Sequence, residues 1–337
     1  MGNFQKEKEL VKEFHKLLDR DDAASTRNAF KKFTSSELIW RGFYPFDEFR
    51  DSAEVVEGFW QPLKCSLNSM QRREDIFFAG GNYVDNFESV WVVSMGHLMG
   101  LFDQPWLGIA PTHKMAFLRY CEFHRIADGN IQETAMYFDI PHFMVQAGRD
   151  VFPKQTAVNL VQPGPRTHAG LLYGEQLGKE GSITLALINK MISDLGQWEN
   201  DLPLEEELRL TWHDDMIWWG PTGIGSAYTI ERYAKQHARP FRAAFSDRSG
   251  TGHIARLAEG NYGGFFGWPN FSARLTDDFM GYPATGKKAE FRVIDIYRRN
   301  GKKLAENWVF IDLLYFWKQQ GIDVLASNDA HISKSTN

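Results

Sequence analysis

The sequence contains an internal repeat that keeps one register from Gly108 to Gly148. The repeat is clearest where residues 133–148, ETAMYFDIPHFMVQAG, align with residues 306–321, ENWVFIDLLYFWKQQG. Related residues recur 173 positions apart, in pairs that include Glu133 and Glu306, Asp139 and Asp312, Phe143 and Phe316, and Arg125 and Arg298. Nearer the start of each half the match is weaker and the offset is 178, as between Trp40 and Trp218. Such a repeat predicts a tandem duplication of one domain.

The length agrees with two domains and a connection between them. The chain has 337 residues, which is more than a single hydrophobic core usually serves. Pro163-Gly164-Pro165 can continue neither a helix nor a central strand. We therefore predict a first domain over residues 1–150, a linker over 151–180, a second domain over 181–325 and a polar tail over 326–337.

Each half changes from a helical pattern to an alternating one. The halves open with LVKEFHKLLDR and ITLALINKMISDL, and Ser182 is placed to cap the second of these helices. Asp128-Gly129 and Asn300-Gly301 are typical of hairpin turns, and they join predicted strands at residues 116–124 and 131–140, and at 290–298 and 304–313. The pattern indicates α+β domains in which helices pack on a strongly curved antiparallel sheet and enclose an interior.

The composition excludes several classes of function. The chain carries 38 basic and 43 acidic residues, a net charge of −5 without a long run of either sign, so we expect no nucleic-acid partner. Cys65 and Cys121 are the two cysteines, which is too few for a disulfide framework or a zinc motif. The N-terminus lacks a signal peptide and charged residues interrupt every apolar stretch, so we expect a cytoplasmic protein without a membrane partner. Aromatic residues form 14% of the chain and need a packed core or a cavity.

Several motifs of the second half resemble, in order, the SnoaL-like polyketide cyclase (ester cyclase) family. They are Gly220-Pro221-Thr222-Gly223-Ile224, Pro240-Phe241-Arg242-Ala243-Ala244-Phe245-Ser246-Asp247, Ala258-Glu259-Gly260, residues 279–288 (FMGYPATGKK), Asp295-Ile296-Tyr297-Arg298, and Glu306-Asn307-Trp308 followed by Asp312. The resemblance covers most of residues 183–325 and implies a cone-shaped fold of the nuclear-transport-factor-2-like superfamily. We therefore expect a tandem duplication of a cone-shaped α+β domain.

The first half resembles a more diverged copy of the same family. It keeps Gly96-His97-Leu98-Met99-Gly100 and residues 106–112, WLGIAPT, with His113 in place of a family glycine. The second half has Leu275 where the family histidine is expected. Because each copy departs from the family pattern, we do not expect the two halves to be equally active.

The resemblance implies an intramolecular aldol closure that uses no metal and no organic cofactor. Such chemistry needs a base, an acid and an apolar cavity that holds the substrate folded. We expect acid/base chemistry on a small apolar carbonyl compound, by cyclisation, isomerisation, dehydration or hydrolysis. The alternative is a non-catalytic protein that binds a small hydrophobic ligand, with one half serving as an intrachain dimerisation partner. Such folds commonly pair through their sheets, so we expect an intrachain pseudo-dimer, and a homodimer is also compatible with the sequence.

Four residues are the catalytic candidates. Asp139 and Asp312 match the late-strand acid of the family, and the alternative for both is a capping or solvated carboxylate at a strand end. His124 could reach the strand of Asp139 and form a histidine–aspartate couple, which Tyr297 and Asp312 would replace in the second half. His97 lies in the family motif, and for both histidines a hydrogen-bonded core or surface residue is the alternative.

The substrate-binding candidates follow from strand alternation and from the aromatic residues. Tyr120, Glu122 and His124 share one face of their strand, and Val293, Asp295 and Tyr297 share the corresponding face. Glu133 and Glu306 are expected to pair with Arg125 and Arg298 across each hairpin. Core packing is the alternative reading for each tryptophan. The predicted substrate-binding residues are Trp40, Trp218, Trp219, Tyr297, Trp308, Tyr137, Glu122 and Asp295.

Overall fold

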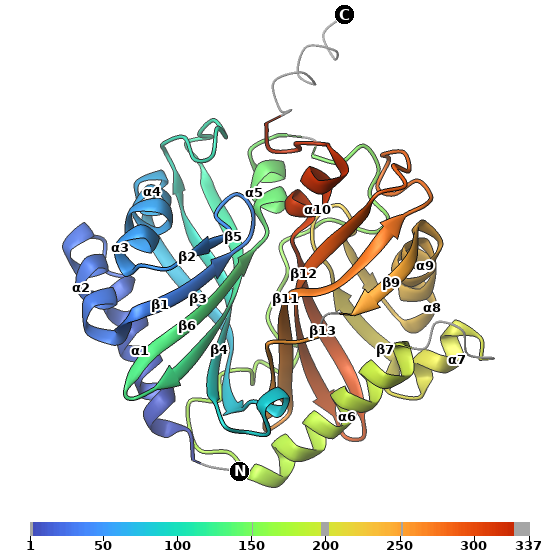
Figure 1. Ribbon diagram of the computed structural model, residues 1–337, viewed down its shortest axis with the longest axis horizontal. Helices are drawn as coiled ribbons and strands as arrows, with labels where there is room; N and C mark the ends of the chain where they lie inside the picture. The colour runs from blue at the N-terminus through green and yellow to red at the C-terminus, as the bar shows by residue number, and fades with distance from the viewer. Residues whose placement is uncertain (1–2, 150, 197–201, 251, 327–337) are drawn as a thin grey trace, which may run out of the picture.

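The computed structural model describes residues 3–149, 151–196, 202–250 and 252–326. Two halves lie side by side, and each consists of a sheet with helices on its outer face, so that the two sheets face each other in the middle of the molecule (Figure 1). Most of the predicted tail, residues 327–337, lies outside the described residues. Within the described part of the chain, no helix is long and apolar enough to cross a membrane.

The first half contains a six-stranded sheet in the order β2-β1-β6-β5-β4-β3. β1 and β6 run parallel, and the other neighbours are antiparallel. The strands are β1 (Thr34–Gly42), β2 (Glu48–Phe49), β3 (Leu67–Gly81), β4 (Val90–Phe102), β5 (Met115–Ala127) and β6 (Asn130–Phe138). The helical segments are α1 (Gln5–Leu18), α2 (Ala23–Phe33), α3 (Ser52–Val55), η1 (Val56–Trp60), α4 (Gln61–Ser66), η2 (Tyr83–Asp85) and α5 (Ile140–Gln146).

The second half repeats this arrangement in a seven-stranded sheet, with the order β10-β11-β12-β13-β7-β8 and β9 paired to β11. β7 and β13 form its parallel pair. The strands are β7 (Trp212–Trp219), β8 (Ser226–Tyr228), β9 (Phe245–Gly250), β10 (Ala255–Glu259), β11 (Tyr262–Leu275), β12 (Lys288–Asn300) and β13 (Lys303–Ile311). The helical segments are α6 (Gly178–Gly196), α7 (Leu204–Arg209), α8 (Ile230–Tyr233), η3 (Ala234–Ala238), α9 (Arg239–Ala244) and α10 (Leu313–Gln320).

The matching strand orders confirm the α+β class and the tandem duplication. The predicted hairpins are β5–β6 and β12–β13, and their ion pairs form as expected, since Arg125 Nε lies 2.7 Å from Glu133 Oε1 and Arg298 pairs with Glu306. The prediction for Ser182 is wrong. Helix α6 begins one turn earlier, at Gly178, and the Ser182 hydroxyl donates to the Gly178 carbonyl within the helix at 3.1 Å.

Aromatic side chains fill the space between the two sheets. The ring of Phe266 on β11 lies 5.3 Å from the ring of Trp91 and 5.2 Å from the ring of Phe123, centroid to centroid. Tyr137 contacts Phe266 and Trp268, and its hydroxyl donates to the Gly267 carbonyl at 2.8 Å. Part of the aromatic excess is therefore used to pack the halves on each other.

Two equivalent aspartates join the halves reciprocally. Asp139 caps α5 by accepting the His142 N–H at 3.0 Å, and its other oxygen accepts the Thr222 N–H of the second half at 2.9 Å. Asp312 caps α10 by accepting the Tyr315 N–H at 3.1 Å, and its other oxygen accepts the Tyr44 N–H of the first half at 2.9 Å.

The two donors in the opposite half, Tyr44 and Thr222, are also equivalent positions, because they are separated by the offset of 178 that relates the early parts of the repeat. Each half therefore presents the same patch to the other, which is the contact pattern of an isologous dimer interface. The duplicated domains are related by an approximate two-fold axis within one chain.

Buried arginines lie beside both aspartates. Arg119 donates to the Val309 carbonyl of the second half at 3.0 Å, and burial lowers its pKa to about 10. Arg292 lies between the rings of Trp268 and Tyr315, and its Nη1 is 3.5 Å from Asp312 Oδ2. Burial raises the pKa of Asp312 to about 7, although Arg292 and the two backbone N–H groups favour its ionised form.

The connection between the halves contacts both of them. The Gly170 carbonyl accepts the Phe77 N–H of β3 at 2.9 Å, and the Val158 carbonyl accepts the Ser226 N–H of β8 at 2.8 Å. Farther from the sheets' centre, Lys8 of α1 forms a buried ion pair with Glu259 of β10 at 2.5 Å. The two halves are therefore tied at several separate places.

We predict that Asp139→Ala lowers the free energy of unfolding by about 2–4 kcal/mol, because it removes a helix cap and a charge-assisted hydrogen bond across the interface. The control is Asp22→Ala, since Asp22 caps α2 by accepting the Ser25 N–H at 2.6 Å and makes no contact with the second half that the structure describes. Asp22→Ala should cost less stability than Asp139→Ala, because it removes only a helix cap. Urea denaturation measures both, and equal losses would show that the contact between Asp139 and Thr222 adds no stability.

Candidate active site

The second half contains a cavity of about 880 Å³ between its sheet and its helices. The wall comes from β7, β11, β12 and β13 on one side and from α6, α7 and the segment α8–η3–α9 on the other. Aromatic and aliphatic side chains form much of it, among them Met191, Leu208, Trp212, Trp218, Phe241, Phe265, Phe271 and Val293. Its size falls within the range of about 300–1,000 Å³ usual for small-molecule sites.

One carboxyl group lines this cavity. Asp295 lies on β12, and its cross-strand neighbours are Phe265 on β11 and Val309 on β13, which also line the cavity. Asn307 Nδ2 donates to Asp295 Oδ1 at 3.1 Å. Burial raises the pKa of Asp295 to about 6, against the smaller opposing effects of Asn307 and of the nearby Tyr297 hydroxyl. Asp295 can therefore gain or lose a proton near neutral pH.

Two histidines line the same cavity and are neutral there. The His237 ring stacks on Trp218 with centroids 4.0 Å apart, and burial lowers its pKa to about 3. The His253 ring stacks on Phe265 at 3.9 Å, and burial with nearby Arg256 lowers its pKa to about 3. Neither imidazole carries a charge at pH 7, so Asp295 is better suited than either to exchange a proton.

The leading catalytic candidates, Asp139 and Asp312, do not line this cavity. β6 ends at Phe138 and β13 ends at Ile311, so strand alternation does not extend to the aspartates that follow. Each carboxylate instead turns back to cap the next helix and reaches a backbone N–H of the other half. Both aspartates therefore cap a helix, which is the alternative role predicted for them from the sequence.

The expected histidine–aspartate couple does not form. His124 Nδ1 is 2.9 Å from Thr134 Oγ1, and its Nε2 is 3.6 Å from Glu122 Oε2. Tyr297 likewise contacts Asp295 rather than Asp312. The register explains this result, because Cα partners across the hairpin place Thr134 opposite His124 and Asn307 opposite Tyr297.

His97 lies on β4 in the first half, buried against Phe117, with its Nδ1 3.4 Å from Asp75 Oδ2. The expectation that Leu275 stands at the equivalent position is wrong. His97 is the cross-strand partner of Arg119, and the counterpart of Arg119 in the second half is Arg292. On β11, Gly267 pairs with Val293 and Phe271 pairs with Phe291, so Arg292 lies opposite the irregular stretch 268–270. Leu275 pairs farther along, with Phe245. The irregular stretch between Gly267 and Phe271 in β11 shifts the alignment of this strand with β4 of the first half.

The predicted aromatic substrate-binding residues have different positions. Trp218 and Tyr297 line the cavity, and Trp219 lines a second hollow of about 660 Å³ together with Leu160 and Tyr228. Trp40 is packed among the rings of Phe49 and Phe59 in the first half. Trp308 is buried and its Nε1 donates to the Pro163 carbonyl at 3.2 Å, while Tyr137 lies in the interface described above.

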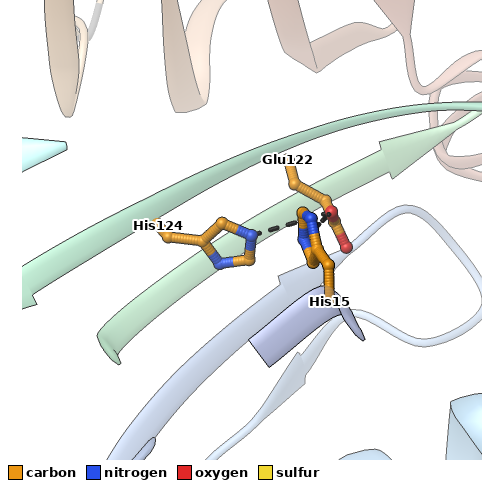
Figure 2. A group of neighbouring side chains, drawn as sticks. All are labelled: His15, Glu122 and His124. Carbon is orange, nitrogen blue, oxygen red and sulfur yellow. Dashed lines mark ion pairs between the residues drawn. The ribbon is translucent and has the colours of Figure 1, made fainter. Parts of the chain in front are cut away.

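In the first half, a group of polar and ionisable side chains lies at the positions that form the cavity wall in the second half. Glu122 is the counterpart of Asp295, and His15 and His124 converge on its carboxylate (Figure 2). His15 Nε2 lies 3.1 Å from Glu122 Oε2. Arg72 Nη1 lies 2.8 Å from the same oxygen, and its guanidinium lies over the ring of Tyr120 at 4.8 Å. Arg72 and the two histidines hold the pKa of Glu122 well below its usual range, despite burial.

The ligand atoms of His15, Glu122 and His124 lie within 4.8 Å of one another, so these residues could in principle hold a metal ion. Arg72 already brings a cation to the carboxylate oxygen that such an ion would need. The donor set therefore fits an internal ion-pair network better than a metal centre. The absence of a metal and of a cofactor stays a prediction.

Several cavity residues did not stand out in the sequence. His237, His253 and Arg256 are isolated residues without a motif around them. They line one cavity only because η3, β10 and the segment just before β10 surround the same space. Asn307 lies inside a motif of the family resemblance, but its hydrogen bond to Asp295 depends on the hairpin register. The shared face of Val293, Asp295 and Tyr297, in contrast, is confirmed by the lining of the cavity.

The equivalent residues Glu122 and Asp295 should respond oppositely to neutralisation at pH 8. Glu122→Gln removes one of the two carboxylates that pair with Arg72, whose Nε still lies 3.0 Å from Asp19 Oδ2, and is expected to lower the free energy of unfolding by about 1.5–3 kcal/mol, the range for a lost hydrogen bond to a charged group. Asp295→Asn removes a carboxyl whose raised pKa disfavours the folded state above pH 6, so the free energy of unfolding should be unchanged or higher. Denaturant unfolding measures both, and a destabilised Asp295→Asn variant would contradict this reading of the cavity.

Comparison with known proteins finds a family model that matches part of this chain. Residues 206–320 match the model of the SnoaL-like polyketide cyclase family. No curated protein matches the chain. Similar solved structures include a protein described as a SnoaL-like polyketide cyclase from Jannaschia sp. CCS1, with 18% identity, a TM-score of 0.35, and coverage of 42% of this chain and 91% of that chain.

Two further similar structures are TsrD from Streptomyces laurentii and an NTF2-like protein from Burkholderia xenovorans LB400. TsrD has 22% identity and a TM-score of 0.32, and the match covers 40% of this chain and 96% of that chain. The NTF2-like protein has 13% identity and a TM-score of 0.34, and the match covers 42% of this chain and 99% of that chain. The family match spans most of the cavity-bearing half, since residues 206–320 match the SnoaL-like polyketide cyclase model.

Proposed function

We propose that the second half catalyses cofactor-independent acid/base chemistry on a small apolar carbonyl compound, with Asp295 as the proton-transfer group. The observation that carries this proposal is the position of Asp295 in an otherwise largely apolar cavity of about 880 Å³, where burial raises its pKa to about 6. A carboxylate with a pKa near the working pH is well suited to take a proton from carbon and return it.

The neighbouring residues suit the other half of the reaction. Asp295 would take a proton from the carbon next to the carbonyl group, and the electron pair of that C–H bond would move to form an enolate. Burial and the nearby carboxyl raise the pKa of Tyr297 well above its usual range, so its hydroxyl stays protonated and can donate to an oxyanion. Return of the proton to another carbon gives isomerisation. Attack of the enolate carbon on a second carbonyl forms a C–C bond and an alkoxide, which takes the proton back from Asp295 and completes cyclisation.

A purely binding role for the same cavity is the second candidate. Its support is the pair of reciprocal hydrogen bonds by which Asp139 and Asp312 join the halves, because the two joined domains have different residues in their interiors. In that case the first half would serve as an intrachain dimerisation partner for a ligand-binding second half. Proton transfer at Asp295 separates the two candidates, because ligand binding alone does not require it.

Hydrogen–deuterium exchange of a simple ketone tests the proposal without knowledge of the natural substrate. We expect the protein to speed deuteration of 2-tetralone next to its carbonyl in D₂O, followed by proton NMR. Asp295→Asn should lower this rate about 10²–10⁴-fold. Asp312→Asn is the control, because Asp312 does not line the cavity. An exchange rate that survives in folded Asp295→Asn, or that is lost in folded Asp312→Asn, would refute the assignment.

The exchange rate should also depend on pH in a defined direction. The active form of a base is deprotonated, so the rate should increase as the pH rises through about 6, the pKa of Asp295, and level off above it. A rate profile measured from pH 4.5 to pH 8 checks this. A rate that is already level at pH 4.5 would mean a midpoint near the ordinary aspartate value of 3.8 and a carboxyl that the cavity does not perturb.

A further inference from the structure

A second charged group faces the cavity on the same wall as Asp295. Cα partners run from Arg256 on β10 to Phe265 on β11 and on to Asp295 on β12. All three residues line the cavity. Because neighbouring strands lie about 4.8 Å apart, the backbones at Arg256 and Asp295 are separated by about 10 Å. The wall therefore presents a cation and a titrating carboxyl two strands apart.

The protein positions the Arg256 guanidinium with neutral partners. Its Nη1 donates to Asn189 Oδ1 at 2.7 Å, and its Nε donates to His253 Nδ1 at 3.1 Å. Burial lowers the pKa of His253 to about 3, so this imidazole adds no charge. Within the described residues, Arg256 has no carboxylate at ion-pair distance. A partly buried charge held only by neutral groups has an unfavourable environment that an anion would relieve.

Arg242, which also lines the cavity, shows the contrasting arrangement. Its Nη2 lies 3.0 Å from Glu207 Oε1, and its Nη1 lies 3.2 Å from Glu207 Oε2. That carboxylate compensates the charge of Arg242 from within the protein. The third cavity arginine, Arg248, lies over the ring of Phe271 at 4.6 Å and adds positive charge to the lining. The cavity thus contains three guanidinium groups and one carboxyl group.

We infer that the substrate of this cavity is an apolar carbonyl compound that also carries a carboxylate, and that Arg256 binds this carboxylate. The inference rests on the proposed function of the cavity and names its substrate class. A guanidinium matches a carboxylate with two parallel hydrogen bonds, and the fixed separation from Asp295 orients the compound along the wall. His253 and Asn189 act as positioning residues, because they hold the guanidinium in place.

Matched neutral and charged probes test this inference by binding alone. Isothermal titration calorimetry at pH 8 compares 2-naphthoate with 2-naphthamide, which has the same shape without the charge. We expect the protein to bind 2-naphthoate about 10- to 100-fold more tightly than 2-naphthamide, the ratio typical of a hydrogen bond to a charged group. Arg256→Gln should remove this preference and leave the affinity for 2-naphthamide within about two-fold, as expected for a lost local contact.

Two further variants make the test specific. Arg256→Lys keeps the charge but loses the forked geometry, so it should retain part of the preference. Arg274→Gln is the matched control, because Arg274 lies on the same sheet, pairs with Asp247 and does not line the cavity. It should keep the full preference. Unchanged affinity for 2-naphthamide in Arg256→Gln also shows that the cavity of that variant is folded.

The outcomes separate this inference from the proposed function. Equal affinity for the two probes, or a preference that persists in Arg256→Gln, overturns the carboxylate assignment and leaves proton transfer by Asp295 intact. Failure of the protein to bind either probe overturns the inference together with the ligand-binding role of the cavity. Loss of ketone exchange in the unmodified protein, with a full preference for 2-naphthoate, would overturn the catalytic proposal alone.

Discussion

The reciprocal hydrogen bonds of Asp139 and Asp312 fix how the two halves of this chain sit on each other. Each carboxylate begins a helix of its own half and accepts a backbone N–H from the other half. The sheets then pack face to face (Figure 1), and the ring of Phe266 lies among rings of the first half. This packing uses the face of each sheet that points away from its helices, so the opposite face of the second sheet, which lines the cavity, stays covered by helices.

The duplication places a buried carboxyl at the same position of each half, Glu122 in the first and Asp295 in the second. The two carboxyls have different partners. At one position of the repeat, Glu122 forms a buried ion pair with Arg72 and lies beside His15 and His124 within the first half. At the equivalent position, Asp295 has hydrogen-bond partners but no cation at ion-pair distance among the described residues. The energetic penalty of burying a carboxyl is thus cancelled in one half and retained in the other. A retained penalty appears as a raised pKa, which is the property that acid/base chemistry uses.

The sequence alone predicted the fold well, because the evidence for it is local or repeated. Strand alternation, the hairpin turns at Gly129 and Gly301, and the offset between the halves all describe backbone structure directly. The site was harder to predict. Asp295 was placed correctly on an inward strand face, but the main catalytic role was given to Asp139 and Asp312, which follow the strands rather than belong to them. Whether a carboxylate at a strand end faces a cavity or caps a helix depends on the direction of the next segment, which alternation does not describe. Arg256 and His253 meet only through tertiary packing, so no spacing could have singled them out.

The account depends on Asp295 being a desolvated carboxyl that titrates near neutral pH. Carbon-13 NMR of protein labelled at the aspartate carboxyl carbons measures this directly, with the Asp295 signal assigned by its loss in Asp295→Asn. The account predicts a titration midpoint near the value of about 6 that burial imposes on this group. A midpoint near 3.8, the ordinary value for aspartate, would show that the carboxyl is solvated and would contradict the proposed chemistry of the cavity.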